Sequence, residues 1–343
     1  MSGGQDGASL RRTLSSEKSW SIAAGGRPRR DSSPGRRSLV LPLARLRAAS
    51  ARGERIARVT YRSPTLADII ATLNVSRIDD RLFAATQLDN PDHHIVGGHI
   101  AAQALMAASL TAPGRRPHSV HVYYVRAGDA SRPVDLDVDV ARDGGTLSTR
   151  KITARQDGQI LLEALASFNE PFDSLDYQQP MPDVADPDSL PPVQEQLAAY
   201  ADELGGHWVR SQPFDLRYID PPPRVALDLP ESSPRLRMWW RPNGSVPSDA
   251  VLHSCLLTYL SGTTMVEPGL VMRRATPVST FNALIDHALW FHRPIDLTDW
   301  VLSDQVSSSG VAGRGLTTST MYNRTGELVC IATQELYFGR ASV

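Results

Sequence analysis

Lysine and cysteine are scarce in this chain: its 343 residues include only two of each. With 36 basic residues in all, two lysines indicate an arginine-rich codon bias rather than arginines selected for their chemistry. Cys255 and Cys330 stand in apolar surroundings without a CxxC spacing. One disulfide is arithmetically possible, but two such cysteines do not make a disulfide framework, and we expect a reducing cytosol.

Long apolar runs and several catalytic motifs are also missing. No stretch approaches the roughly 18 apolar residues of a membrane-spanning helix, so we expect no membrane span. The chain has no GxSxG nucleophile elbow, which argues against an α/β-hydrolase, and no Walker-type loop or GxGxxG. The net charge of −1 gives no electrostatic reason to expect nucleic acid as a partner.

The near-neutral total hides a difference along the chain. Residues 1–62 carry 13 Arg and 1 Lys against 4 acids, a net of +10, so the remaining 281 residues carry −11. Stretches such as GGRPRRDSSPGRRS have almost nothing to bury, which predicts a disordered Arg/Ser/Pro-rich tail. Three interpretations remain open: an inert tail or upstream-extended start, a transit peptide, and an anion-binding arm.

The folded part is predicted to begin with a helix capped by Ser63, with Pro64 at its first position. A longer helix is predicted from the glycine pair at residues 97–98 to the Pro-Gly pair at residues 113–114. Its interior is mostly alanine on several faces, which indicates a buried helix rather than a surface one.

Strands are predicted to follow this second helix. Residues 134–140 alternate valine or leucine with aspartate, the period of a half-buried strand whose acidic face is solvated. Residues 146–168 give two more strands joined by a turn at Asp157-Gly158. The first half of the chain is therefore predicted to consist of a helix followed by antiparallel strands.

The same order returns after a Pro- and Asp-rich stretch at residues 173–235, which is interpreted as a connection laid over the surface. A helix is predicted from an N-cap at Ser248 to Gly262, followed by strands and a turn at Thr325-Gly326. The strand-like run NALIDHALWFHRP lies in this half.

The two halves repeat each other in order and spacing. Arg126 to Gly158 is 32 residues and Arg293 to Gly326 is 33, with both glycines at the turn before the last long strand. We expect an α+β fold, a tandem (double) hotdog, each half a long helix wrapped by an antiparallel sheet. The expected boundaries are a tail at 1–62, an N-terminal hotdog at 63–172, a connection at 173–235 and a C-terminal hotdog at 236–343.

A histidine cluster in DHHIVGGH is not expected to hold a metal. Asp92, His93, His94 and His99 lie close together in the sequence, but adjacent histidines point apart and no second cluster completes a zinc shell. A loop that precedes a helix is the simpler interpretation, and no metal is expected.

Six motifs occur in one order along the chain: GGHIAAQALMAAS, HSVHVYYVRAGDASRPVDLDVDVARDG, TRKITARQDGQILLEALASF, RPNGSVPSD, DHALWFHRP and GELVCIATQE. Together they resemble the acyl-CoA thioesterase II family of double-hotdog enzymes, over residues 65–340. The resemblance implies hydrolysis of fatty acyl-CoA to fatty acid and CoA by an activated water, without a cofactor. It also implies a homodimer or a larger homo-oligomer, and the cytoplasm as the location.

The resemblance implies one active site, made from a Gln, a Ser or Thr, and an Asp around a water. Gln334 in ATQE matches the Gln. The Ser or Thr position is occupied by Leu284 and the Asp position by Gly262, neither of which transfers a proton. Thr263, beside the Gly262 position, is a replacement hydroxyl able to hold a water, as are Ser261 and Thr264, although a hydroxyl alone is a poor base.

The Asp-His pair of the family is present as Asp286 and His287. The resemblance implies that Asp286 orients His287 and that this pair supplies a base. Arg293, in the HRP motif beside His292, is implied to pair with a carboxylate or with the CoA phosphates. A buried hydrogen-bond network that fixes the sheet register is the structural alternative for all of these groups.

Substrate binding is expected at the start of the first long helix and on a basic rim. Backbone N–H groups at Gly98 and His99 are candidates for stabilising an oxyanion. Arg142 and Arg150, together with Lys151, are candidates for binding the CoA phosphates, although basic residues on a strand are by default just solvated.

Two rival functions are kept. A double hotdog with Gly262 and Leu284 at the site can be a non-hydrolysing acyl-CoA-binding protein. The stretch LDNPDHH also resembles the Asp-x-Asn-Pro-x-His stretch of hotdog enoyl-CoA hydratases, but Leu88 stands at the leading acid position and Asp89 one residue late.

Overall fold

The structure is a computed structural model that describes residues 63–90, 94–210, 212–277 and 282–339. The predicted tail at residues 1–62, and Asp92 and His93 of the histidine cluster, lie outside these described residues. The fold below belongs to the unit Thr60–Val343.

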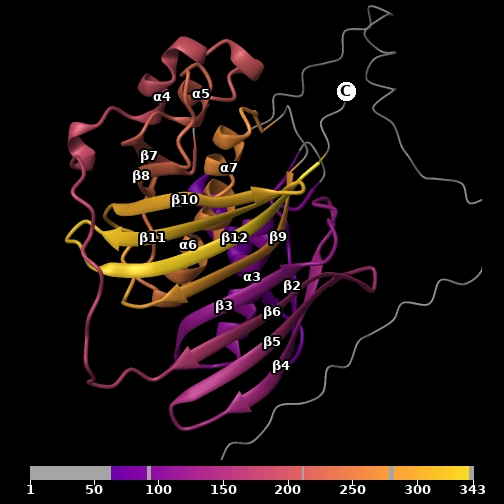
Figure 1. Cartoon of the computed structure of the whole chain (residues 1–343). Coiled ribbons are helices and arrows are strands. Elements are labelled where there is room, and N and C mark those ends of the chain that lie inside the picture. Colours follow the sequence, from indigo (N-terminus) through magenta and orange to yellow (C-terminus); the bar gives the residue numbers. More distant parts are fainter. Residues whose placement is uncertain (1–62, 91–93, 211, 278–281, 340–343) are drawn as a thin grey trace, which may run out of the picture. The chain divides into compact units, whose positions relative to one another are not determined.

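Twelve strands form one sheet (Figure 1). They are β1 Ser76–Arg77, β2 Leu82–Ala85, β3 Arg116–Tyr124, β4 Val134–Asp143, β5 Leu147–Gln156, β6 Gln159–Asn169, β7 Phe214–Tyr218, β8 Arg235–Pro242, β9 Asn282–Phe291, β10 Val301–Val311, β11 Arg314–Asn323 and β12 Leu328–Phe338. Their spatial order is β1-β2-β4-β5-β6-β3-β9-β12-β11-β10-β8-β7, and neighbouring strands are antiparallel.

The helices are α2 Leu66–Leu73, α3 Gly97–Leu110, α4 Val193–Gln196, α5 Pro223–Ala226, α6 Ala250–Thr264 and α7 Glu267–Met272. Short 3-10 turns are η1 Pro187–Ser189, η2 Ala198–Tyr200 and η3 Glu203–Gly205. Both long helices, α3 and α6, lie behind the sheet in the view of Figure 1. Among the described residues, no helix has the length and apolar content needed to cross a bilayer.

The strand order confirms the internal repeat and the tandem hotdog fold. In the N-terminal half the order β2-β4-β5-β6-β3 accompanies α3, and in the C-terminal half β8-β10-β11-β12-β9 accompanies α6. The two half-sheets meet where β3 pairs with β9, with His121 opposite Ala288. The C-terminal half is thus built like the N-terminal half, and one antiparallel strand pair joins them.

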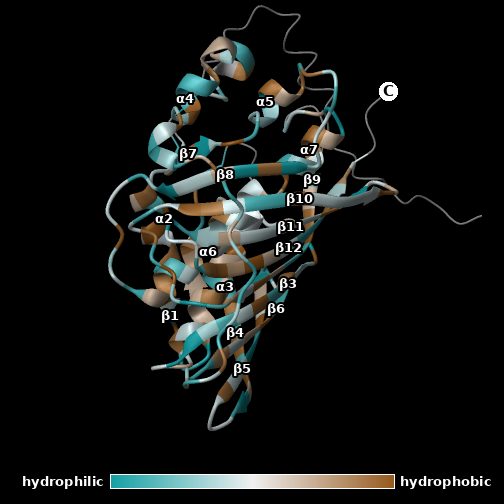
Figure 2. Cartoon of the chain, turned by 60° about the vertical axis from the view of Figure 1, so that its left-hand side comes forward, coloured by the Kyte–Doolittle hydropathy of each residue, from teal (hydrophilic) through white to brown (hydrophobic). Residues whose placement is uncertain are grey.

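Several local predictions are confirmed. β5 and β6 are joined by Asp157 and Gly158, both of which have positive φ (49° and 74°), as a two-residue hairpin turn requires. β4 buries Val134, Leu136 and Val138 and exposes the aspartates between them. Figure 2 shows this alternation as brown and teal bands along the strands.

Two predicted helix starts are displaced by one or two residues. The first helix is capped by Thr65, not Ser63, because Thr65 and Asp68 form a reciprocal capping box. The cap of α6 is Asp249, not Ser248, since the Asp249 carboxylate accepts from two backbone N–H groups of the first turn.

The stretch interpreted as a surface connection contributes to the sheet. β7 pairs with β8, placing Leu216 opposite Trp240, and Phe214 and Tyr218 are buried. Proline-rich flanks on both sides of this short strand concealed it, because a five-residue strand has too few alternations to stand out.

The two long helices are buried and touch backbone to backbone. Eleven of the fourteen residues of α3 and twelve of the fifteen of α6 are buried. A Cβ added at Gly98 would lie 2.5 Å from the Tyr259 carbonyl oxygen, and one added at Gly262 would lie 2.6 Å from Gly98 Cα. Only glycine permits this approach, because any side chain would push the helices apart.

We predict that Gly98→Ala and Gly262→Ala each destabilise the protein by about 1–3 kcal/mol, the range for overpacking a core. Gly145→Ala is the matched control, since a Cβ there meets nothing within 4 Å. The free energy of unfolding, measured in urea, tests this. Equal stability of all three variants would mean that α3 and α6 separate without strain.

His99 on α3 is a buried structural group. Its side chain is 1% exposed, and its Nε2 lies 2.9 Å from Thr72 Oγ1, which ties α3 to α2. Burial lowers the pKa of His99 from 6.5 to about 3, so the imidazole is neutral in the folded protein at neutral pH. In the unfolded chain the same group takes up a proton below about pH 6.5.

The lowered pKa of His99 predicts acid sensitivity. Between about pH 6.5 and pH 3 the unfolded state binds one proton more, so His99 removes up to about 1.4 kcal/mol of stability per pH unit as the pH falls. His99→Gln should therefore flatten this slope relative to the wild type. Urea unfolding at pH 7, 6 and 5 measures the slope, and identical slopes would refute the assignment.

Candidate functional site

A cavity of about 510 Å³ lies where α3 begins, α6 ends and β9 begins. Its wall includes Gly97, Tyr124, Gly262, Thr263 and Leu284. These residues come from both halves of the chain, so the site is formed by the tandem arrangement rather than by one hotdog alone. The volume lies within the range of small-molecule sites.

Two of the three positions singled out by the resemblance line the cavity, and the third, Gln334, bonds to one of them. Gly262 and Leu284 line the cavity. Gln334 on β12 is fully buried, and its Nε2 donates to the Gly262 carbonyl oxygen at 3.3 Å. No described residue bonds to Gln334 Oε1, which leaves a buried acceptor available beside Gly262.

His287 lies directly opposite Gln334 across the β9–β12 pair. It is fully buried, and its Nε2 lies 3.2 Å from Ser261 Oγ on α6. Burial lowers the pKa of His287 from 6.5 to about 3, so the ring is neutral and a weak base. Its Nδ1 has no partner among the described residues. His287 and Gln334 thus form a buried polar pair, each with one free hydrogen-bonding atom.

The predicted orientation of His287 by Asp286 is wrong. Consecutive residues of a strand point to opposite faces, so the Asp286 side chain leaves the inner face on which His287 lies. Asp286 Oδ1 accepts from the Glu335 backbone N–H at 3.1 Å. Ser261, from α6, is the residue that contacts His287 instead.

A β-bulge in β9 directs Leu284 into the cavity. Leu336 of β12 pairs with Leu284 and Glu335 pairs with Asp286, so Ile285 is an extra residue in β9. Without this bulge, Leu284 and His287 would point to opposite faces, because they are three positions apart. With it, Leu284 contacts the start of α3: a Cβ added at Gly97 would lie 2.2 Å from Leu284 Cδ1.

The start of α3 has no side-chain cap. Its N-cap residue is Val96, which offers no oxygen to the first N–H groups. Tyr124, on the cavity wall, donates its hydroxyl to the Gly97 carbonyl oxygen at 3.0 Å. Gly97 therefore presents the amide end of a helix to the cavity, and Leu284 covers part of it.

The hydroxyls near Gly262 have different surroundings. Thr263 lines the cavity, and its Oγ1 donates to the Leu260 carbonyl at 2.9 Å, which leaves its lone pairs able to accept. Ser261 faces His287, and Thr264 accepts from Gln305 Nε2 at 3.1 Å inside the core. Thr263 is the hydroxyl of the three that reaches the cavity.

The predicted substrate-binding residues are dispersed. Gly98 packs against α6 and the His99 side chain points to Thr72, so neither residue lines the cavity. Arg150 is 2% exposed and is held by Asp143 and Thr111, which corrects its placement on a solvent-facing rim. Arg142, in contrast, lies on an exposed stretch of β4.

Arg293 is paired with a carboxylate, as one of its two predicted roles required. Its guanidinium bonds to Asp176 and to the Leu328 carbonyl oxygen. Arg293 lines a separate cavity with Arg116 and His292, away from Gly262. No group of three or more metal-ligating side chains occurs among the described residues.

Sequence reasoning did not find Tyr124 or the Ser261–His287 contact. The signal for Ser261 was its position beside Gly262, but nothing in a sequence shows that α6 and β9 meet there. Tyr124 stands at the end of a strand, where an aromatic residue gives no sign of the cavity beside it.

Known proteins match this chain in both halves. Residues 86–169 match the acyl-CoA thioesterase N-terminal domain, and residues 183–338 match the acyl-CoA thioesterase C-terminal domain. "Acyl-CoA thioesterase 2" of Haemophilus influenzae is 30% identical over 286 residues, which are 80% of this chain and 97% of that protein. "Acyl-coenzyme A thioesterase 8" of Homo sapiens is 28% identical over 283 residues, 78% of this chain and 87% of that protein.

Solved structures agree with these matches. The tesB protein of Mycobacterium avium subs paratuberculosis is 41% identical, with a TM-score of 0.69 over 80% of this chain and 100% of that one. The acyl-CoA thioesterase II TesB2 of Mycobacterium marinum is 31% identical, with a TM-score of 0.66 over 80% of this chain and 98% of that one. Since both of its hotdog halves match, in order and over nearly the full length of these relatives, the chain belongs to the acyl-CoA thioesterase II family.

Proposed function

We propose that this protein hydrolyses fatty acyl-CoA thioesters to the free acid and CoA in the cavity between Gly97, Gly262 and Leu284. The observation that carries the proposal is the buried His287–Gln334 pair, which lies next to Gly262 and has two hydrogen-bonding atoms that no described residue satisfies. The relatives named acyl-CoA thioesterases support the reaction class.

The reaction needs a positioned water and no covalent intermediate on the protein. The water oxygen adds to the thioester carbonyl carbon and the negative charge develops on the carbonyl oxygen. The tetrahedral intermediate then breaks its C–S bond, and the sulfur leaves with a proton as the CoA thiol. The acid leaves as a carboxylate, with the second proton released to solvent. A thioester carbonyl is electrophilic enough for this attack once water is held in place.

The residues of the site divide these tasks. Gln334 Oε1 and the Thr263 hydroxyl are acceptors for the protons of the attacking water. The amide end of α3 at Gly97 stabilises the developing oxyanion through its N–H groups. His287, whose pKa of about 3 makes it a poor proton acceptor, holds Ser261 and the water in place. Because the site has no carboxylate to act as a base, we expect a low kcat for thioester hydrolysis.

A second candidate function is acyl-CoA binding without hydrolysis. Leu284 covers Gly97 at the start of α3, and Gly262 supplies no carboxylate. Both features weaken catalysis but leave the cavity able to hold an acyl group. The third alternative, an enoyl-CoA hydratase, has less support, since the relatives that show the family are named as thioesterases.

We further propose that the protein acts in the cytoplasm as a homodimer or larger homo-oligomer. Two buried free cysteines fit a reducing compartment. The outer face of β3 and β6 carries exposed apolar side chains, Tyr123 and Leu165, as a surface between subunits does.

Thiol release from a series of acyl-CoAs, C4 to C18, tests the reaction with the full chain. We expect slow release of CoA thiol, and a loss on the order of tenfold to hundredfold in kcat for Gln334→Ala, the range for removing a positioned polar group. Thr333→Ala is the matched control, because Thr333 is the neighbouring residue of β12 and points to the other face. Binding of acyl-CoA without any thiol release would contradict hydrolysis and support the second candidate function, acyl-CoA binding.

Leu284→Thr tests whether this leucine limits the rate. The shorter side chain uncovers Gly97 and adds a hydroxyl, so turnover should rise severalfold, while stability falls because Leu284 packs against Leu270 and Leu336. Leu147→Thr, at a leucine 44% exposed at the start of β5, is the control and should change neither turnover nor stability. Unchanged thiol release in a folded Leu284→Thr protein would contradict the limiting role.

A further inference from the structure

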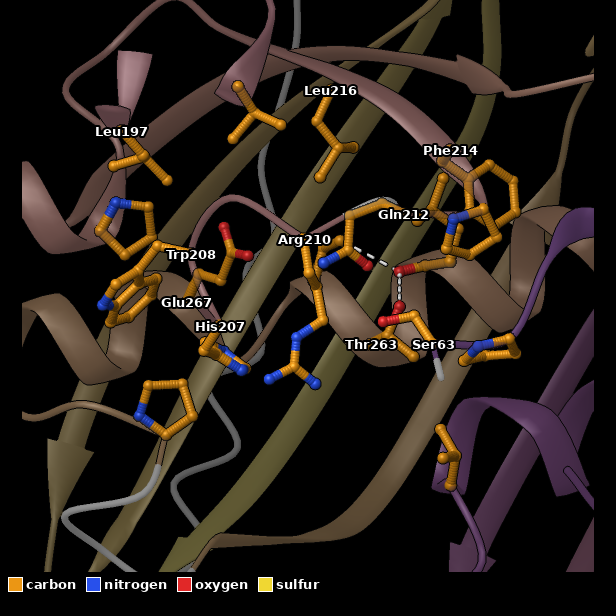
Figure 3. A pocket seen from close by; sticks show the side chains of 18 of the residues that line it. Ser63, Leu197, His207, Trp208, Arg210, Gln212, Phe214, Leu216, Thr263 and Glu267 are labelled. Atoms are coloured by element: carbon orange, nitrogen blue, oxygen red, sulfur yellow. Dashed lines mark hydrogen bonds between the residues drawn. The ribbon is translucent and has the colours of Figure 1, made fainter. Parts of the chain in front are cut away.

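A second cavity, of about 340 Å³, lies on the other side of the end of α6 (Figure 3). One wall is formed by the connection between the hotdogs, including Leu197, Trp208 and Phe214. The opposite wall is formed by the end of α6 and the start of α7, including Leu260 and Glu267. No residue of the proposed catalytic machinery other than Thr263 belongs to this cavity.

The two cavities are neighbours. Both are lined by Val96, which precedes α3, and by Thr263 on α6. The second cavity therefore adjoins the place where the thioester is proposed to lie, with Val96 and Thr263 between the two. In the view of Figure 3, Thr263 lies on one side of this cavity, Glu267 on the other, and Arg210 between them.

The lining of the second cavity is not purely apolar, as a tunnel for an unsubstituted hydrocarbon chain would be. Leu88, Leu197 and Leu216 give it apolar surface, but Glu267, Arg210 and His207 also face it. A saturated chain end would leave these polar groups against hydrocarbon, at a cost in binding free energy. The arrangement fits a chain that carries a polar group at this depth.

Glu267 is the carboxyl group among these polar side chains. The Tyr218 hydroxyl donates to its carboxylate, at 3.1 and 2.9 Å to the two oxygens. Burial raises the pKa of Glu267 from 4.5 to about 7, so both protonation states are accessible at neutral pH. A carboxyl group in this state can accept a hydrogen bond or donate one. The reaction proposed above makes no use of it.

We propose that the second cavity binds the distal part of the acyl chain and selects substrates that carry a hydroxyl group there, with Glu267 as the specificity-determining residue. The inference rests on the proposed acyl-CoA function of the first cavity. A hydroxyl suits Glu267 in both states, since it donates to the carboxylate and accepts from the protonated acid.

A charged substituent on the acyl chain would fit the second cavity less well than a hydroxyl group. A carboxylate on the chain would lie against Glu267, and like charges in a buried site repel. An ammonium group would lie near Arg210, which faces the same cavity. A neutral hydroxyl avoids both repulsions.

The test compares the affinity of ω-hydroxyacyl-CoAs with that of the unsubstituted acyl-CoAs, from C6 to C16, by calorimetry on the full chain. At one chain length the hydroxyl should tighten binding about tenfold, the effect of one buried hydrogen bond to a charged or polar partner. Glu267→Leu should abolish or reverse this preference. Glu267→Gln retains an acceptor for Tyr218 and should keep part of it, which covers the case that Glu267→Leu does not fold.

Binding is measured separately from thiol release, so the two proposals fail in different ways. Binding with a hydroxyl preference but no thiol release would refute hydrolysis and support the selectivity. Thiol release with equal affinities at every chain length, or a preference that survives in folded Glu267→Leu, would overturn the selectivity and leave hydrolysis standing. Leu147→Thr is again the control, since Leu147 is exposed at the start of β5, lines neither cavity and should keep the wild-type ratio.

Discussion

The contact between Gly98 and Gly262 sets the position of everything around the site. It lets α3 and α6 meet backbone to backbone, and so brings the amide end of one helix beside the carboxyl end of the other. The cavity, the Gln334 contact to Gly262 and the second cavity all lie at this crossing. A side chain at position 262 would need the space that Gly98 occupies, since a Cβ there would lie 2.6 Å from Gly98 Cα.

The interior of the C-terminal hotdog contains several buried polar side chains. Along β9 to β12 the inward positions include His287, Gln305, Thr317 and Gln334, all fully buried. Each of the four has an atom that no described residue satisfies. Unsatisfied buried polar atoms cost free energy, and structures keep them chiefly where water or a ligand supplies the missing bonds. These four atoms therefore lower the stability of the folded protein unless water or a ligand bonds to them.

The sequence predicted the order of elements well and the directions of side chains less well. The two long helices, strands β4 to β6 and β9 to β12 and both turn glycines follow from local sequence and were found, whereas the short strand β7 was missed. The role of Asp286 and the inward turn of Leu284 were not, because the bulge at Ile285 is a property of the β9–β12 register. Arg150 was placed on the surface because the strand pattern does not show that Asp143 and Thr111 enclose its guanidinium. The directions of these side chains depend on strand pairing and on contacts between residues far apart in the sequence.

The joining of two hotdogs through β3 and β9 has a consequence for how the molecule assembles. Ser119 and Trp290, paired across this seam, belong to one chain, so their association is intramolecular. Two separate single-hotdog chains would associate only at a sufficient protein concentration. Because both copies would have the same sequence, every substitution would appear in both. In this chain the β3–β9 pairing does not depend on protein concentration, and a substitution in one half leaves the sequence of the other half unchanged. That independence allows one end of the helix pair to keep a cavity while the other end is filled by structural contacts such as those of His253.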